Sequence, residues 1–362
     1  MSRALRYAVL LAVAVCASAA AQEEAASGVD VRATVTGQFA ASSLFTQSGV
    51  DKSPAAAGMR AVVYPTIKVS DHWTASAAWQ LYTEPYFVDS FTEKGSGAKG
   101  TLLQGTLNYS RVSGRGSITA RAGMMSTAFG SFLLRYDDAD NPLVDLPQSY
   151  GYYYEPVTSL GVLAAQIDAT RGRWDGRVQF ANSSPANPRS IFARDQYGNW
   201  AGGAGVTVRQ GFRIGVSGYR GPYLSRDSAF FFPGEGNPNT QIAHALGADV
   251  QFARGHWNVQ GEFQRFAMPY KLIPTYREDA GYTELRRVLH PRWYVASRIG
   301  YSSATFGGTT TRYEFAAGYR PARHELIKAG YQLNHHNTGS ITNDNTFALQ
   351  FITTLHASHA LR

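Results

Sequence analysis

The chain has 362 residues, of which 17% are charged and 13% are aromatic, and its formal net charge is +8. No run of eighteen apolar residues follows the N-terminal segment, which excludes a transmembrane helix, and the mean hydropathy is −0.25. The basic residues are dispersed along the chain, so the positive charge does not indicate nucleic-acid binding.

Residues 1–21 have the pattern of an export signal. Arg3 and Arg6 precede a short apolar core, and three alanines ending at residue 21 form a small-residue cleavage site. The core is too short to span a bilayer. Cys16 is the only cysteine, so the mature chain, residues 22–362, contains none and disulfides are excluded.

From Val31 onward, segments of about ten residues alternate apolar and polar side chains. About sixteen such segments follow one another, each long enough to cross the hydrocarbon layer as a tilted strand. The weakest strand prediction covers residues 282–289, because the adjacent Arg286 and Arg287 must point to opposite faces; a short helix is the alternative there. The alternation also places Leu103 and Leu107 together on an apolar face.

Short turns and long loops alternate between these segments, as expected for a barrel with one end in the periplasm and the other outside the cell. A secreted β-sandwich or solenoid is the alternative fold, but nothing in a sandwich enforces that alternation. A tryptophan opens the strand after four of the short turns: Trp73, Trp174, Trp257 and Trp293. These four residues predict an aromatic girdle at the periplasmic interface of the membrane.

The longest irregular segment runs from Ser126 to Thr158 and contains three prolines, four aspartates and a tyrosine-rich run. A structureless loop of more than about fifteen residues is usually functional in a compact domain. We predict that this segment folds into the barrel and narrows the lumen. The alternative is a surface loop that stacks on its own tyrosines.

Two chemical alternatives have weaker support. A hydrolytic barrel would need a nucleophile motif near His335–His336, His356 or His359, and none is recognisable. The run 137–141 offers oxygen ligands for calcium but lacks the spacing and glycine of a helix-loop-helix calcium site. We therefore expect no catalytic residue, no cofactor and no metal.

The faces predicted to point inward carry about eleven basic and about seven acidic side chains, and basic lumens favour anions. The sequence therefore predicts a weak anion preference, in which Arg121 and Arg298 take part. The alternative is a neutralised network that stiffens the wall. The inward-facing bases include Arg60, Lys68, Arg121, Arg177, Arg213, Arg298, Arg312 and Lys328.

In architecture the mature chain resembles the general bacterial porins and, more distantly, the phosphate-selective porins. The shared features are an export signal, about sixteen amphipathic strands, and a third long loop that is the longest. The resemblance implies an all-β transmembrane antiparallel barrel in the outer membrane of a Gram-negative type of bacterium. It also implies passive diffusion of small polar solutes, contact with membrane lipid and lipopolysaccharide, and a homotrimer.

The resemblance further implies that acids of the long loop (126–158) face a cluster of arginines on the wall. The predicted constriction consists of Arg121, Arg135, Asp137, Asp138, Asp140, Asp145, Arg177, Arg298 and Arg312. The chain departs from these porins at its end, where a terminal aromatic residue is usual. Here the last strand passes Phe351 and Leu355 and finishes in HASHALR. No basic ladder specific for phosphate is present, so phosphate selectivity is not implied.

Overall fold

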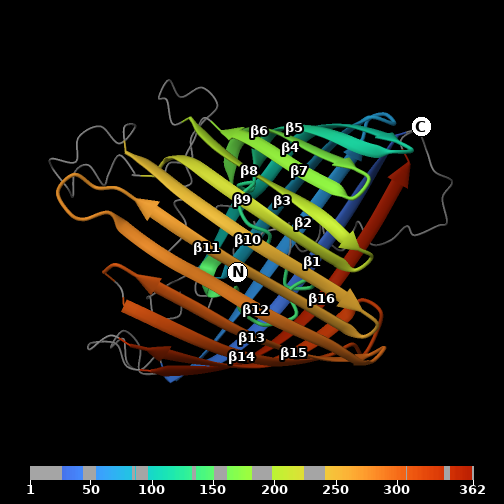
Figure 1. The fold of residues 1–362 in the computed structure, drawn as a ribbon. Helices are drawn as coiled ribbons and strands as arrows, with labels where there is room; N and C mark the ends of the chain where they lie inside the picture. Colours follow the sequence, from blue (N-terminus) through green and yellow to red (C-terminus); the bar gives the residue numbers. More distant parts are fainter. Residues whose placement is uncertain are drawn as a thin grey trace.

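A computed structural model describes residues 27–43, 54–83, 86, 97–132, 136–150, 161–181, 198–223, 241–306, 308–337 and 343–360. These residues form one closed antiparallel barrel of sixteen strands, in which each strand pairs with its neighbours in sequence and β1 pairs with β16 (Figure 1). The predicted fold class is confirmed. The predicted signal, residues 1–21, lies outside the described residues.

The sixteen strands follow one another along the chain. Their bounds are β1 (Gly28–Ser42), β2 (Ala55–Lys68), β3 (Trp73–Thr83), β4 (Ala98–Ser113), β5 (Gly116–Met125), β6 (Val162–Arg171), β7 (Trp174–Ala181), β8 (Asn199–Arg209), β9 (Phe212–Pro222), β10 (Ile242–Arg254), β11 (Trp257–Met268), β12 (Tyr276–His290), β13 (Trp293–Ala304), β14 (Gly308–Tyr319), β15 (Glu325–His336) and β16 (Asp344–Ala360). A short 3-10 helix, η3 (Gln148–Tyr150), lies between β5 and β6.

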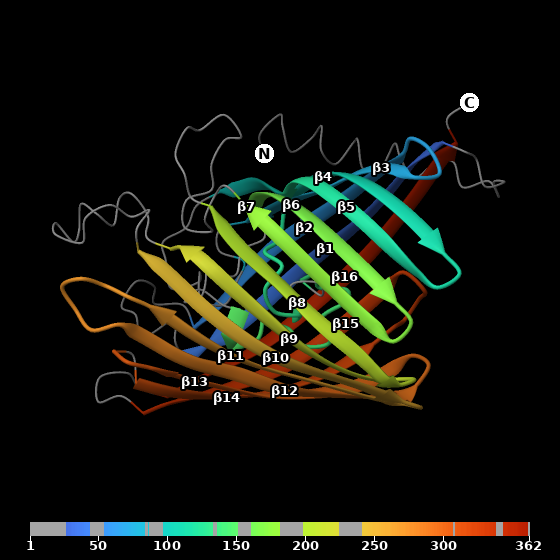
Figure 2. The same ribbon diagram turned by 45° about the horizontal axis from the view of Figure 1, so that its top comes forward.

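The two ends of the barrel differ in their connections (Figure 2). At one end, which we call the turn end, successive strands are joined by two to five residues, and β1 begins and β16 ends there. The other end, which we call the loop end, carries the longer connections. The predicted strict alternation is wrong at one place, because only residues 305–307 join β13 to β14 at the loop end.

The outer surface of the barrel is apolar between its two ends. All six tryptophans are exposed, between 40% and 65%, as are many leucine, valine, isoleucine and phenylalanine side chains of the strands. Exposing so much apolar surface to water is unfavourable, whereas lipid solvates it. Among the residues placed in the structure, no helix combines the length and the apolar character needed to span a membrane.

The predicted girdle tryptophans share one position in the fold. Trp73, Trp174, Trp257 and Trp293 are the first residues of β3, β7, β11 and β13, so all four lie at the turn end. Their role at a membrane interface stays a prediction. Trp79 and Trp200 are exposed nearer the loop end, and the ring of Trp200 lies 4.9 Å from that of Phe180.

Two local predictions are resolved by the register. In the β3–β4 pair, Trp79 lies opposite Leu102 and Ala78 opposite Gln104, so Leu103 is an extra residue in a β-bulge. The side chain of Leu103 is only 6% exposed and packs inside the barrel, so its predicted outward position is wrong. Leu107, at 48% exposure, does face outward.

The uncertain segment 282–289 is part of β12, and the alternative helix is wrong. Arg287 extends over the ring of the girdle residue Trp257, with 4.7 Å from the guanidinium carbon to the ring centroid. Arg286 points to the inner face and lies 4.7 Å over the ring of Tyr294. The two adjacent arginines therefore do occupy opposite faces, and the outward one is accommodated by an aromatic partner at the turn end.

Candidate functional site inside the barrel

The segment between β5 and β6 contacts the inward faces of strands on the opposite wall. We call its described residues, 126–132 and 136–150, the inner segment. It starts and ends at β5 and β6, yet Asp137 accepts hydrogen bonds from Thr34 of β1 (2.9 Å) and Tyr64 of β2 (2.5 Å). Strands β1 and β2 are not neighbours of β5 or β6, so these bonds require the segment to reach across the lumen.

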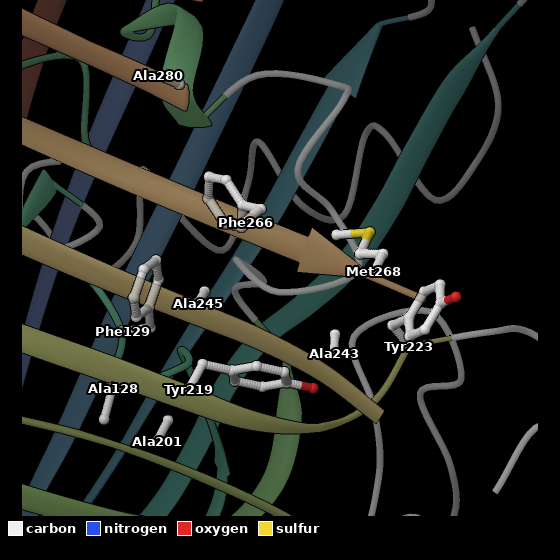
Figure 3. Close-up of a cluster of buried hydrophobic side chains, with 10 residues drawn as sticks. All are labelled: Ala128, Phe129, Ala201, Tyr219, Tyr223, Ala243, Ala245, Phe266, Met268 and Ala280. Atoms are coloured by element: carbon white, nitrogen blue, oxygen red, sulfur yellow. The ribbon is translucent and has the colours of Figure 1, made fainter. Parts of the chain in front are cut away.

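The first part of the inner segment packs against β8 to β11 (Figure 3). Phe129 is completely buried there, and its ring centroid lies 5.8 Å from that of Phe266 in an edge-to-face arrangement. The amide of Gln179 fixes the backbone beside it, donating to the carbonyl of Ser126 and accepting from the amide of Ala128. A glycine-rich β8 and the small residues Ala201, Ala243 and Ala245 leave room for these rings.

A buried carboxylate, Glu262 of β11, binds both described stretches of the inner segment. It accepts hydrogen bonds from the backbone amide and hydroxyl of Ser131, both at 3.0 Å, and from the hydroxyl of Tyr150 at 2.5 Å. Burial and the adjacent Glu262 carboxylate raise the pKa of the Tyr150 phenol well above its usual range. The phenol therefore stays protonated, and remains a donor, throughout the physiological pH range.

A second polar cluster joins the inner segment to β1 and β2. The carboxylate of Asp138 accepts from Arg60 (3.2 Å), Thr36 (3.0 Å) and Tyr86 (2.9 Å). Arg60 is 2% exposed, and its guanidinium also lies 4.4 Å over the ring of Tyr136. Burial and the nearby Asp138 raise the pKa of Tyr86 well above its usual range, so this phenol too remains a donor.

Lys328 of β15 anchors the middle of the inner segment. Its side chain is fully buried, and the Nζ atom donates to the backbone carbonyls of Asp138 (2.9 Å), Asn141 (3.1 Å) and Leu143 (2.9 Å). An ammonium group has three donors, so these three carbonyls satisfy all of them. One wall residue thus fixes the path of six consecutive residues of the segment.

Arg298 of β13 and Arg312 of β14 bind the inner segment at Asp145. Arg298 makes two hydrogen bonds to Glu314 (2.6 and 2.7 Å), one to Glu284 (3.3 Å) and one to the carbonyl of Asp145 (2.6 Å). Arg312 reaches the carboxylate of Asp145 at 3.2 Å. The charge of Arg298 is therefore neutralised by two carboxylates of the barrel wall, Glu284 and Glu314. The carboxylate of Asp145, in the inner segment, pairs with Arg312 instead.

The structure brings together some, but not all, of the residues predicted for the constriction. Those that contact across the lumen are Asp137, Asp138, Asp145, Arg298 and Arg312. Arg177 donates to the carbonyl of Gly130, and Asp140 is exposed. Arg121 lies apart from the aspartates of the inner segment and pairs with Asp168 of β6 at 3.1 Å. Arg135 lies outside the described residues.

Three important residues were not assigned to the constriction from the sequence. Arg60 and Lys328 were predicted to face inward but not to bind the loop, and Glu262 was not singled out. The alternation of apolar and polar side chains does indicate that these three residues face inward, because each is a charged residue on the polar face of a strand. The alternation does not show which wall residue the loop reaches. The role of the whole group as a constriction stays a prediction.

The histidines and the aspartate-rich run do not form a metal centre in the described part of the chain, where no three metal-type ligands converge. Asp137 and Asp138 are instead used by hydroxyl and guanidinium donors. His336 lies between Thr310 and Asp344, at 3.1 Å from each, with its two nitrogens facing their oxygens.

The inner wall nearer the turn end has an uneven charge distribution. On β7, β9 and β10, Arg213 is neutralised by Asp175 and Asp249, each at 2.6 Å. Arg286 of β12 and Arg320, the residue after β14, interact electrostatically with Tyr294 of β13, and neither forms an ion pair with an acid among the described residues. The Nε atom of Arg286 is buried without a hydrogen-bond partner. This sector of the lumen therefore presents uncompensated positive charge.

A closed barrel with an apolar exterior and a charged interior is the construction of membrane-spanning channels. No family model and no curated protein matches the sequence. Solved structures do match the fold. An anion-selective porin from Comamonas acidovorans has a TM-score of 0.63 at 8% identity, covering 91% of this chain and 100% of that chain.

Two further structures agree with this result. The outer membrane channel DcaP of Acinetobacter baumannii has a TM-score of 0.62 at 11% identity, covering 93% of this chain and 100% of its own. The trimer form of OmpT, an outer membrane protein of Vibrio cholerae, has a TM-score of 0.57 at 11% identity, covering 91% of this chain and 100% of that chain. The chain has the fold of the bacterial outer-membrane porins.

Proposed function

We propose that this protein is an outer-membrane porin through which small polar solutes and ions diffuse passively. The observation that carries the proposal is the separation of side chains by face, with exposed apolar residues outside and charged residues such as Arg60, Arg298 and Lys328 inside. In this proposal the inner segment narrows the lumen, because it binds wall residues from β1 and β2 round to β11. No energy source or cofactor is needed.

The orientation that we propose for the channel in the outer membrane follows from its apolar outer surface and from the difference between its two ends. The apolar belt would be solvated by membrane lipid, with the turn end in the periplasm, and lipopolysaccharide would surround the loop end. A homotrimer is also proposed, in view of the trimer form described for the OmpT protein of similar fold. A hydrolytic barrel that uses the lumenal histidines is the alternative, suggested by the contacts of His336 with Thr310 and Asp344.

Planar-bilayer recording tests the proposal directly. The purified, refolded protein should produce stable conductance steps that scale with salt concentration. A protein that is inserted and β-rich but gives no steps would contradict diffusion through the lumen. Ester and peptide hydrolysis would then be measured with the His336→Ala variant as the control for the alternative function.

We further propose an anion preference, carried by Arg286 and Arg320. The sequence-based hypothesis relied on Arg121 and Arg298, but both are now seen to be paired with acids. The R286Q/R320Q double variant should lower the ratio of anion to cation permeability by roughly twofold or more, because it removes unpaired positive charge from the lumen. The measurement is the reversal potential under a salt gradient.

Arg111→Gln is the matched control for this change. Arg111 lies opposite the exposed Ile118 on the outer face at the same end of the barrel, so the lumenal charge is unaffected. The control should retain the wild-type reversal potential. An unchanged permeability ratio in the double variant would rule out these two arginines as the source of selectivity.

A further inference from the structure

A group of basic residues faces outward at the loop end of strands β9 to β12. We call Arg220, His244, Arg265 and Arg277 the rim patch; all four are exposed. Their outward direction follows from their neighbours, because Tyr219, Ala245, Phe266 and Glu278, each adjacent in sequence to one of them, are buried inside the barrel.

The register places the rim patch on adjacent strands. Arg220 lies opposite His244, His244 opposite Ala267, and Ala267 opposite Arg277, which makes one row across four strands. Arg220 and Arg277 are therefore three strand spacings apart, or roughly 14 Å. Arg265 lies two residues from this row, opposite Asp279.

The charge of the rim patch is only partly neutralised. Arg265 forms a two-pronged pair with Asp279, at 2.6 and 2.8 Å. Arg220 and Arg277 have no acidic partner among the residues that the structure describes. Outward positions at the same end of the other described strands, for example Ala41, Phe180 and Asn345, include no lysine or arginine. Among the described strand residues, the outward-facing lysine and arginine side chains at the loop end are thus confined to one sector of the barrel.

The depth of the rim patch matches that of a lipid headgroup. Trp200, which is 55% exposed and packs on Phe180, lies directly opposite Arg220 in the β8–β9 pair. Outward tryptophans sit at the boundary between hydrocarbon and headgroups. Arginine guanidinium groups at that level can form paired hydrogen bonds with phosphate oxygens.

We propose that the rim patch binds the headgroup of an outer-leaflet glycolipid that carries at least two phosphates. Arg220 and Arg277 would each contact one phosphate, with His244 between them. This proposal rests on the proposed membrane location, but it does not require that the lumen conduct ions.

Binding of lipids to the refolded full-length protein in detergent tests the proposal. A diphosphorylated lipid A-type glycolipid should bind, seen as retained mass in native mass spectrometry and as a raised unfolding temperature. The R220Q/R277Q double variant should bind at least about tenfold more weakly. The dephosphorylated glycolipid should bind wild type as weakly as the variant does, and inorganic phosphate alone should not stabilise the protein.

Arg171→Gln/Arg254→Gln is the matched control, since both arginines are exposed and lie opposite outward-facing tryptophans at the turn end. It should bind the diphosphorylated lipid like wild type. Equal binding by R220Q/R277Q and wild type would overturn the proposal, as would stabilisation by free phosphate. A change of oligomeric state in R220Q/R277Q without a change in lipid binding would assign the patch to a second copy of the chain instead. Bilayer conductance, measured on the same samples, separates failure of this proposal from failure of the channel.

Discussion

Replacing Lys328 by methionine is expected to release the inner segment from β15 and to lower the free energy of unfolding by about 3–5 kcal/mol. Methionine has a similar length but no donor, so the carbonyls of Asp138, Asn141 and Leu143 lose their shared partner in a place that water does not reach. Urea unfolding followed by tryptophan fluorescence measures the stability. In bilayers the variant should show larger or strongly fluctuating conductance steps.

Lys68→Met provides the control for this variant. Lys68 also lies on the polar face of a strand, but its side chain is 43% exposed and its partner Asp71 is more exposed still. The expected loss of stability is below about 0.5 kcal/mol, and the current should be steady. If the K328M protein had the same free energy of unfolding and the same steady current as wild type, Lys328 would not hold the inner segment in place.

Replacing Arg298 by methionine is expected to destabilise the barrel by about 3–5 kcal/mol, because two buried carboxylates then lack a cation. Glu284 and Glu314 are 2% and 3% exposed, so water cannot take over the role of the guanidinium. Adding Glu314→Gln to the variant removes one of the orphaned charges. The R298M/E314Q protein should therefore be more stable than R298M when both are unfolded in urea.

The outward pair of Arg265 and Asp279 is the matched comparison for Arg298. It has the same two-pronged geometry across neighbouring strands, but the arginine side chain is 64% exposed. Arg265→Met should cost less than about 1 kcal/mol. If R298M and R265M were equally stable, or if E314Q failed to improve R298M, burial of the Arg298 charge would not be the cause of the effect.

The fold could be predicted from the sequence because alternation of side chains and the order of turns are local properties of the chain. Trp257 and Trp293 each stand at the first residue of a strand. Because successive side chains of a strand point to opposite faces of the sheet, the alternation of polar and apolar residues shows which side chains face inward. The bulge at Leu103 was missed because one inserted residue shifts the pattern without changing its composition. The short connection between β13 and β14 was missed because polar strand ends resemble loops.

The candidate site was less predictable, for a geometric reason. The sequence indicated that aspartates of the long loop would meet inward-facing bases, and for Asp145 and Arg312 this is so. For Asp138 the partner is Arg60, on a strand distant in the barrel, and not Arg121. Which base is reached depends on the path of the loop through the lumen, and that path is set by packing of Phe129 and by Lys328. No local pattern specifies it.

Closure of the barrel by β1 and β16 also constrains how the protein assembles. The seam joins Gly28 to Ala360 and Ser42 to Thr346, so its hydrogen bonds connect opposite ends of the chain. Contacts at such long sequence separation form late and slowly. The inner segment binds residues on β1, β15 and β16, on both sides of that seam. The inner segment can therefore align β1 and β16 with each other before the hydrogen bonds between these two terminal strands form.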